Sequence, residues 1–269
     1  PGAVYYRASG LFLPQQATRD QHLSRAGLIA HETAHMWFGN LVTMKWFDEV
    51  WLKEVFANFY ADKIIKPYFK DISFHHLFYC NHYPAAMAID RTGGTTPVMQ
   101  KLDNLLDAGT IYGPIIYHKA PIVMNMLEQK TGEENLQTGI QEYLQTYQYA
   151  NADRDDLITI LQSKSNDNLK SWSDNWINSA GMPVIHNSVE IGAKKESKLI
   201  ITQSLPAGKK SGWEQQCQYL LQYQDTSILF DIHLTGDTLA YSVSEDNLQF
   251  ILPNSDASGY GYFRLDSQS

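Results

Sequence analysis

Two histidines and a glutamate within five residues have the types and spacing to bind and use a metal ion. Residues 31–35 read His-Glu-Thr-Ala-His. In a helix, positions i and i+4 share a face, so the imidazoles of His31 and His35 can reach one ion. Glu32 lies about 100° around the helix from His31, where it can hold a water molecule without binding the ion. The pattern predicts a zinc site that activates water, with Glu32 as the catalytic base.

A catalytic zinc ion usually has three protein ligands and one open position, so a third ligand is needed. Glu54 follows in the segment Trp51-Leu52-Lys53-Glu54, near the start of the next expected helix. Antiparallel packing of the two helices would return Glu54 to the histidines. No His-x-x-Gly-x-x-His extension follows, which disfavours a site with a third histidine. We therefore expect His31, His35 and Glu54 to bind one Zn²⁺ ion.

The alternative is that both histidines lie on a solvated helix face, because the motif can arise by chance in a chain with 9 histidines. The surrounding residues argue against it, since they make the helix apolar nearly all round and predict that it is buried. These residues are Ile29, Ala30, Ala34, Met36, Trp37 and Phe38. Buried imidazoles and a buried carboxylate without partners would be unfavourable, and a metal ion removes that cost.

Two further polar groups have expected partners. Asn58 lies one turn after Glu54 and can accept a ring N–H from a metal-binding histidine. The other possibility is that Asn58 is simply exposed. Asp90 and Arg91 are adjacent, and we expect them to form a local ion pair.

The elements that must position these residues are helices in the first two thirds of the chain. Helical spacing covers residues 17–38, 50–66, 121–130, 134–147, 154–164 and 169–179. After Gly181-Met182-Pro183, short alternating runs punctuated by turn residues predict strands. These runs are Ser188–Ile191, Leu199–Gln203, Gln218–Tyr223, Ile228–Leu234, Leu239–Val243 and Leu248–Leu252. We expect an α+β, multidomain chain, with a mainly helical domain at residues 1–182 and a small all-β sandwich at residues 183–269.

The composition is that of a globular protein and disfavours two classes of partner. Of the 269 residues, 43% are hydrophobic and 19% charged, which is enough apolar material for a core. The net charge of −8 argues against nucleic-acid binding, which needs a basic surface, and against anionic membranes. No apolar run is long enough to predict a membrane-spanning helix, and no signal-peptide pattern or compartment is indicated. Cys80 and Cys217 are expected to be buried free thiols.

The segment His31–Lys63 resembles the aminopeptidase N family, which belongs to the gluzincin zinc metallopeptidases. That family shows His-Glu-x-x-His, eighteen further residues and then Glu, within segments similar to Trp37–Thr43 and Trp51–Ala57. Lys53 and Val55 stand where the family usually has Asn and Gly. The resemblance implies a thermolysin-like zinc catalytic domain. It also implies an aminopeptidase, which hydrolyses peptide substrates with metal-activated water and removes their N-terminal residues.

A second match lies at Ile116–Pro121, which is similar to a Tyr-x-Lys-Gly motif of the family. The resemblance implies that Tyr117 donates its hydroxyl to the oxyanion that develops on the substrate. Tyr112 is the fallback candidate. The departures from the motif are Ala120 and Pro121. Because Pro121 has no N–H for the carbonyl of Tyr117, we expect Tyr117 just before a helix or in its first turn.

The family's anchor for the substrate amine is a glutamate in a Gly-Ala-Met-Glu-Asn motif, which has no counterpart here. Gly2-Ala3 is followed instead by Val4-Tyr5-Tyr6. We expect this chain to be a fragment that begins directly after that motif, with the remaining domains of the parent chain as partners. The ends of the β region, near Gly181–Val184 and Ile251–Asn254, also resemble the small β domain of the family.

Two other functions stay open on the sequence. A thermolysin-type endopeptidase shares the site of two histidines and one glutamate. A zinc-binding module with a structural or interaction role and no turnover is the other alternative, and it applies chiefly to this chain in isolation.

Overall fold

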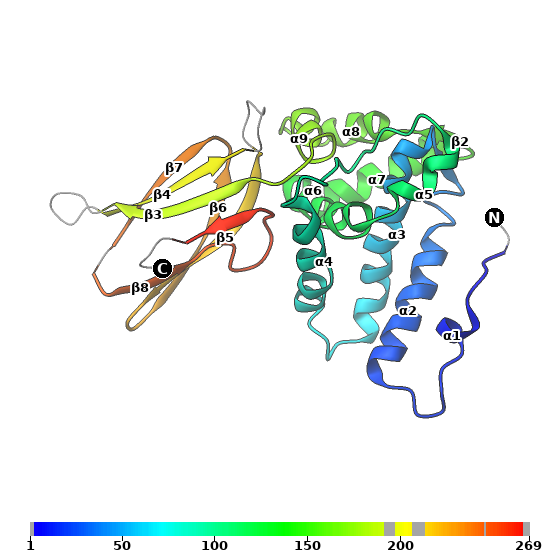
Figure 1. The fold of residues 1–269 in the computed structure, drawn as a ribbon, viewed down its shortest axis with the longest axis horizontal. Helices are drawn as coiled ribbons and strands as arrows, with labels where there is room; N and C mark the ends of the chain where they lie inside the picture. The colour runs from blue at the N-terminus through cyan, green and yellow to red at the C-terminus, as the bar shows by residue number, and fades with distance from the viewer. Residues whose placement is uncertain (1–2, 191–196, 206–212, 245, 266–269) are drawn as a thin grey trace.

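The fold is α+β, as predicted. The computed structural model describes residues 3–190, 197–205, 213–244 and 246–265. Helices occupy the N-terminal part of the chain, and most strands gather at the other end of the molecule (Figure 1). The α-helices are α1 (Ala8–Leu11), α2 (Arg19–Ala34), α3 (Val50–Ile65), α4 (Phe74–Asp90), α5 (Ala108–Ile111), α6 (Ala120–Thr131), α7 (Glu133–Tyr147), α8 (Arg154–Gln162) and α9 (Leu169–Trp176). No helix in this described part combines the length and hydrophobicity needed to span a bilayer.

The strands form three sheets. β1 (Val42–Met44) pairs in parallel with β2 (Ala150–Ala152), beside the helices. The later strands are β3 (Val184–Glu190), β4 (Ser197–Ser204), β5 (Gln215–Tyr223), β6 (Ser227–Leu234), β7 (Thr238–Val243), β8 (Leu248–Leu252) and β9 (Tyr262–Arg264). They make a four-stranded sheet, ordered β7-β4-β3-β9, and a three-stranded sheet, ordered β6-β5-β8. Ile191, the end of the first expected strand, lies outside the described residues.

Apolar residues from both of these sheets form one core between them. Ile185, Leu199 and Ile201 of the first sheet lie in the same buried cluster as Cys217, Tyr219 and Ile232 of the second. The alternating burial along β4 and β5 is what an inward-facing and an outward-facing row of side chains produces. A larger cluster fills the helical part and includes two residues from beyond it, Trp213 and Tyr260.

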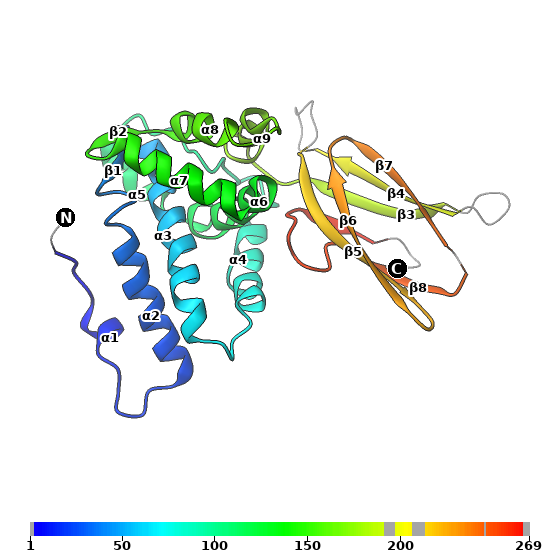
Figure 2. The ribbon, with the colours of Figure 1, turned by 180° about the vertical axis from the view of Figure 1, so that it is seen from behind.

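The helix α2 carries the His-Glu-Thr-Ala-His motif and lies at the edge of the helical part. It begins with a capping box, in which the side chains of Thr18 and Gln21 each accept the other residue's backbone N–H. The prediction that this segment is buried all round is wrong. Trp37 is 48% exposed and Ile29 is 39% exposed, whereas Ala30 and Ala34 are buried. The reason is that α2 packs mainly on α3, which leaves its other face open (Figures 1 and 2).

The helix α3 is central, between α2 and α4 (Figure 2). Ten of its sixteen residues are buried, including Glu54 in its second turn. A helix that is apolar on most sides can be accommodated only inside a core. Glu54 is therefore carried by one of the most enclosed elements of the fold.

The helix α4 was not among the predicted elements, because Pro84 lies inside it. Proline removes the N–H that would bond the carbonyl four residues earlier, here that of Cys80. Both residues are exposed, so solvent can satisfy that carbonyl. The expectation that Cys80 is a buried thiol is thus wrong, while Cys217 is buried and both are free.

A buried ion pair lies where the helical part meets the β part. Lys119 Nζ lies 2.8 Å from Asp90 Oδ2, and both side chains are 0% exposed. The same ammonium donates to the carbonyl of Gly181 at 2.7 Å, and the Tyr260 hydroxyl donates to Asp90 at 3.2 Å. Asp90 therefore pairs with Lys119, which is 29 residues away in the sequence. The expectation that Asp90 pairs with the neighbouring Arg91 is wrong. Burial selects the long-range partner, because a fully desolvated carboxylate needs a cation that is enclosed with it.

A second buried carboxylate lies at the start of α3. Glu49 accepts the indole N–H of Trp51 at 2.8 Å and the backbone N–H of Arg154 at 3.4 Å. It thereby joins the first turn of α3 to the first turn of α8. Burial raises the pKa of Glu49 to about 7, and these two hydrogen bonds offset only part of that effect.

The buried ion pair predicts a large loss of stability on substitution of Lys119. Lys119→Met leaves Asp90 without its cation and is expected to lower the free energy of unfolding by about 3–5 kcal/mol. Lys101→Met is the matched control, because Lys101 pairs with Asp103 at 2.9 Å but both side chains are largely exposed. Urea denaturation measures both variants. Equal losses from the two would show that the Lys119 pair has no special role.

Glu49 predicts a pH-dependent effect. Its folded pKa lies above the ordinary value of 4.5, so the folded state binds the proton more tightly. Stability is therefore lost as pH rises from about 4.5 through about 7. Glu49→Gln removes this penalty and should stabilise the protein at pH 8 relative to pH 5, by up to about 3 kcal/mol. Urea unfolding at both pH values tests this. Glu134→Gln, at an exposed position of α7, should show no such difference.

Candidate metal centre

The structure brings the three predicted metal ligands together. His31 and His35 come from the C-terminal end of α2 and Glu54 from the start of α3. The Nε2 atoms of the two histidines are 3.1 Å apart. Glu54 Oε2 lies 3.6 Å from His31 Nε2 and 3.7 Å from His35 Nε2. These three residues form a cluster that can hold a metal ion, with all candidate ligand atoms within 4.8 Å of one another.

The second nitrogen of each imidazole is held by an acceptor. His35 Nδ1 lies 3.0 Å from the carbonyl oxygen of Phe38, which can only accept, so this nitrogen carries the proton. His31 Nδ1 lies 2.8 Å from Asn58 Oδ1 and donates to it in the same way. The partner predicted for Asn58 is therefore present. In the neutral rings both Nε2 atoms then present lone pairs toward the same point.

This arrangement fits a tetrahedral divalent ion. Two nitrogen lone pairs 3.1 Å apart repel each other unless a cation lies between them, and Glu54 adds a negative charge at the same point. Zinc–nitrogen and zinc–oxygen bonds of about 2.0–2.1 Å at tetrahedral angles separate ligand atoms by about 3.3 Å. The observed separations of 3.1, 3.6 and 3.7 Å are close to that value.

Lys53 holds the other oxygen of Glu54. Its Nζ lies 2.9 Å from Glu54 Oε1, which leaves Oε2 facing the histidines. Burial raises the pKa of Glu54, but the contacts with His31 and Lys53 outweigh burial and lower it to about 2. The carboxylate is thus ionised over the whole physiological range. The stem of Lys53 passes Gly39, where an added Cβ would lie 3.3 Å from Lys53 Cδ, so a side chain there would crowd it.

Glu32 lies one residue along α2 from His31 and is half-buried. Its carboxylate makes none of the hydrogen bonds or ion pairs found among the described residues, so it is free to bind a water molecule. The negative charge of Glu32 affects the pKa of two tyrosines. After burial, Glu32 is a cause of the raised pKa of Tyr6, and it also contributes to the raised pKa of Tyr117.

Tyr117 lies in the π-helical turn η4 (Ile115–Lys119), directly before α6. Its expected position just before a helix is confirmed. Burial raises its pKa to about 12, and the carboxylates of Glu54 and Glu32 add to the effect, so the phenol is neutral. Tyr112, the fallback candidate, has its ring centroid 6.2 Å from that of Tyr117 and lies 6.0 Å from Lys53 Nζ.

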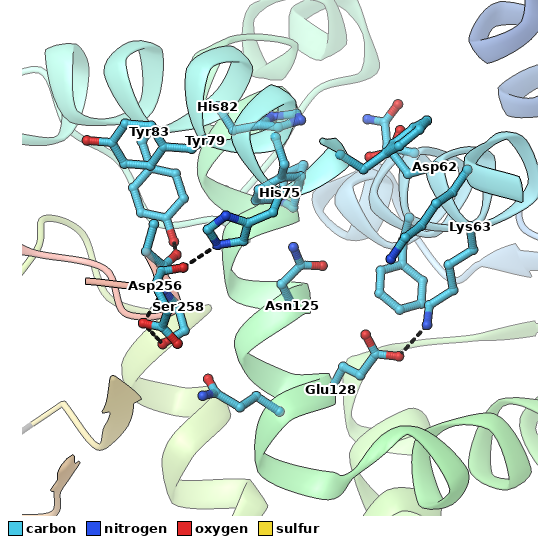
Figure 3. A pocket seen from close by; sticks show the side chains of 18 residues that line it. Asp62, Lys63, His75, Tyr79, His82, Tyr83, Asn125, Glu128, Asp256 and Ser258 are labelled. Atoms are coloured by element: carbon cyan, nitrogen blue, oxygen red, sulfur yellow. Dashed lines mark hydrogen bonds and ion pairs between the residues drawn. The ribbon is translucent and has the colours of Figure 1, made fainter. Parts of the chain in front are cut away.

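A pocket of about 500 Å³ lies between α3, α4 and α6 (Figure 3). Its lining includes Asn58, which holds His31, and His82, whose Nδ1 lies 3.1 Å from the carbonyl oxygen of Tyr117. Lys63 and Glu128 pair across another part of its wall at 2.7 Å. Asn58 and His82, which contact His31 and Tyr117 respectively, therefore line the same pocket.

The sequence did not indicate the roles of Lys53, His82 or Lys119. Lys53 was noted only because it stands where a relative would have Asn. The contact of His82 with Tyr117 joins residues 35 positions apart, and no local pattern marks such a pair.

Comparison with known proteins agrees with this geometry. A model of the peptidase family M1 domain matches residues 1–176. Probable aminopeptidase 2 of Sulfurisphaera tokodaii is 34% identical over 188 residues, which is 70% of this chain and 24% of the relative. Puromycin-sensitive aminopeptidase of Caenorhabditis elegans is 35% identical over 185 residues, 68% of this chain and 20% of the relative. Aminopeptidase N of Lactobacillus delbrueckii subsp. lactis is 30% identical over 217 residues, which is 79% of this chain and 26% of the relative. The chain spans about a quarter of the length of these curated relatives.

The contact between Asn58 and His31 predicts an effect on metal affinity. Asn58→Leu removes the acceptor that orients the ring, and it should weaken binding of Zn²⁺ or Co²⁺ by about 10–100-fold. Asn58→Asp keeps an acceptor at the same place and should bind at least as tightly as the unchanged chain. Competition with a chromophoric chelator measures both affinities. Unchanged affinity in Asn58→Leu would contradict the assignment of His31 as an oriented ligand.

Proposed function

Since this chain belongs to peptidase family M1, of the aminopeptidase N type, we propose that it forms the zinc-binding core of an aminopeptidase. In this proposal His31, His35 and Glu54 are the zinc ligands, Glu32 is the catalytic base and Tyr117 stabilises the oxyanion. The observation that carries it is the pair of Nε2 atoms 3.1 Å apart, with the Glu54 carboxylate beside them. A cation is the group that such a cluster requires.

The chemistry proposed is hydrolysis of a peptide bond by water. When bound, a zinc ion would supply Lewis acidity to the scissile carbonyl and lower the pKa of water toward about 7. Glu32 accepts the proton of the attacking water and passes it to the leaving amine, because its carboxylate has no hydrogen-bond or ion-pair partner among the residues that the structure describes. Tyr117 donates its hydroxyl to the oxygen that becomes negative. The raised pKa of this phenol keeps its proton in place at neutral pH.

We also propose how the chain is divided. Residues 1–182 form a thermolysin-like catalytic domain, and residues 183–269 form a β-sandwich domain. The break between the last helix and β3 and the separate core between the two sheets support this division. The substrates are peptides, and the partners are the remaining domains of the parent chain. Those domains would supply the anchor for the amino group of the substrate.

An endopeptidase of the thermolysin type is the second candidate. It would use the same ligands and the same base, and it would need no anchor for a free amine. Comparing turnover of free peptides with that of their N-acetylated forms separates the two. An aminopeptidase should cleave only the free forms. A zinc-binding module without turnover is the third candidate, and measured hydrolysis by the zinc-loaded chain would exclude it.

The assigned base gives the central test. Glu32→Gln keeps the size of the side chain but cannot accept a proton, and it should lower kcat by about 10²–10⁴-fold with little change in zinc affinity. Glu134→Gln, at an exposed position of α7, is the matched control and should keep full turnover. Hydrolysis of an aminoacyl p-nitroanilide is measured beside the zinc content. Near-normal turnover of Glu32→Gln with zinc bound would show that another group is the base.

A further inference from the structure

Pro121 cannot donate the α-helical hydrogen bond to the carbonyl of Tyr117. In an α-helix the carbonyl of residue 117 would accept the N–H of residue 121, but that residue is proline and has none. Here the chain forms a π-helical turn, in which the N–H of Ala120 bonds the carbonyl of Ile115. Such single π-helical turns inside helices are frequent at functional sites.

A histidine from another helix approaches that carbonyl. His82 lies in the third turn of α4, and its Nδ1 is 3.1 Å from the carbonyl oxygen of Tyr117. A carbonyl oxygen only accepts, so Nδ1 of His82 carries the proton and donates it. His118 Nδ1 lies 3.3 Å from the same nitrogen, and it must then act as an acceptor in this pair.

The surroundings hold His82 in this tautomer and position. Its ring packs on Phe78 with centroids 4.5 Å apart, and it lines the pocket shown in Figure 3. Burial lowers the pKa of His82 to about 4, and the neighbouring His118 adds to this, so the ring is neutral at pH 7. A neutral ring with its proton on Nδ1 is a fixed donor toward Tyr117.

We propose that His82 is a positioning residue that supplies, from α4, the hydrogen bond that Pro121 withholds, and thereby sets the direction of the Tyr117 phenol toward the metal centre. The inference rests on the role proposed above for Tyr117. His82 touches neither the metal ligands nor Glu32 in the described structure. Its effect passes through the backbone of η4.

The hydrogen bond can be observed directly by NMR. Tyr117-His118 is the only Tyr-His pair in the sequence, so protein labelled with carbonyl-¹³C tyrosine and ¹⁵N histidine gives a single correlated signal for this peptide bond. His82→Leu should move the Tyr117 carbonyl signal upfield, because the donor is lost. His82→Asn places an amide N–H close to where Nδ1 lies and should keep the signal near its original position. His82→Gln, one carbon longer, is the matched control and should behave like His82→Leu.

A second substitution tests the link to proline. Pro121→Ala returns a backbone N–H to the helix. Combined with His82→Leu, it should bring the carbonyl signal back downfield. A signal that does not move in His82→Leu overturns the inference. Failure of Pro121→Ala to restore the signal overturns the claim that His82 acts in place of the missing N–H.

Turnover distinguishes positioning from general stability. His82→Leu should lower kcat about tenfold with little change in KM, and His82→Asn should recover most of the loss. In a Tyr117→Phe background, His82→Leu should have no further effect on kcat. An equal loss in both backgrounds would contradict the positioning role. If Tyr117→Phe alone keeps full turnover while the carbonyl signal still responds to His82, the proposed role of Tyr117 fails and the hydrogen bond stands.

Discussion

The buried ion pair between Lys119 and Asp90 is the interaction on which the arrangement of the other elements depends. Lys119 ends the π-helical turn that carries Tyr117, and Asp90 ends α4. Gly181 accepts from the ammonium, and Tyr260 donates to the carboxylate. Four separate parts of the chain thus meet at two charges with no exposed surface. Because neither charge is tolerated alone in such a place, the elements that carry them must stay together.

The candidate metal centre consists of three residues, and a small number of neighbouring groups hold them in place. Helical geometry alone places His31 and His35 on one face of α2. Everything else comes from contacts between elements. Asn58 and the carbonyl of Phe38 orient the two rings, and Lys53 turns one oxygen of Glu54 toward them. The cluster is therefore preorganised by neighbours that each satisfy the outer atom of a ligand.

The departures from the aminopeptidase N pattern have physical counterparts in the structure. Lys53 replaces a neutral side chain and forms an ion pair with Glu54, which offsets much of the negative charge at the centre. Pro121 removes a backbone donor next to Tyr117, and His82 lies within hydrogen-bonding distance of the carbonyl concerned.

Spacing along the chain was sufficient to predict the helices around the motif and the later strands, and it pointed to His31, His35 and Glu54 as neighbours. These features depend on backbone geometry and on periods of 3.6 and 2 residues, which the order of residue types reveals. The sequence also predicted that Glu54 lies beside the two histidines, and it does because α2 and α3 pack on each other.

Only the tertiary structure decided the rest. It showed that Trp37 is exposed, that α4 continues through Pro84, and that Asp90 pairs with Lys119 and not with Arg91. These outcomes depend on which distant segments share the same enclosed volume. A buried charge or donor takes its partner from whatever segment is enclosed with it, and adjacency in the sequence says nothing about that. The sequence by itself thus determined which side chains could do chemistry. The packing of segments far apart along the chain determined which groups those side chains contact.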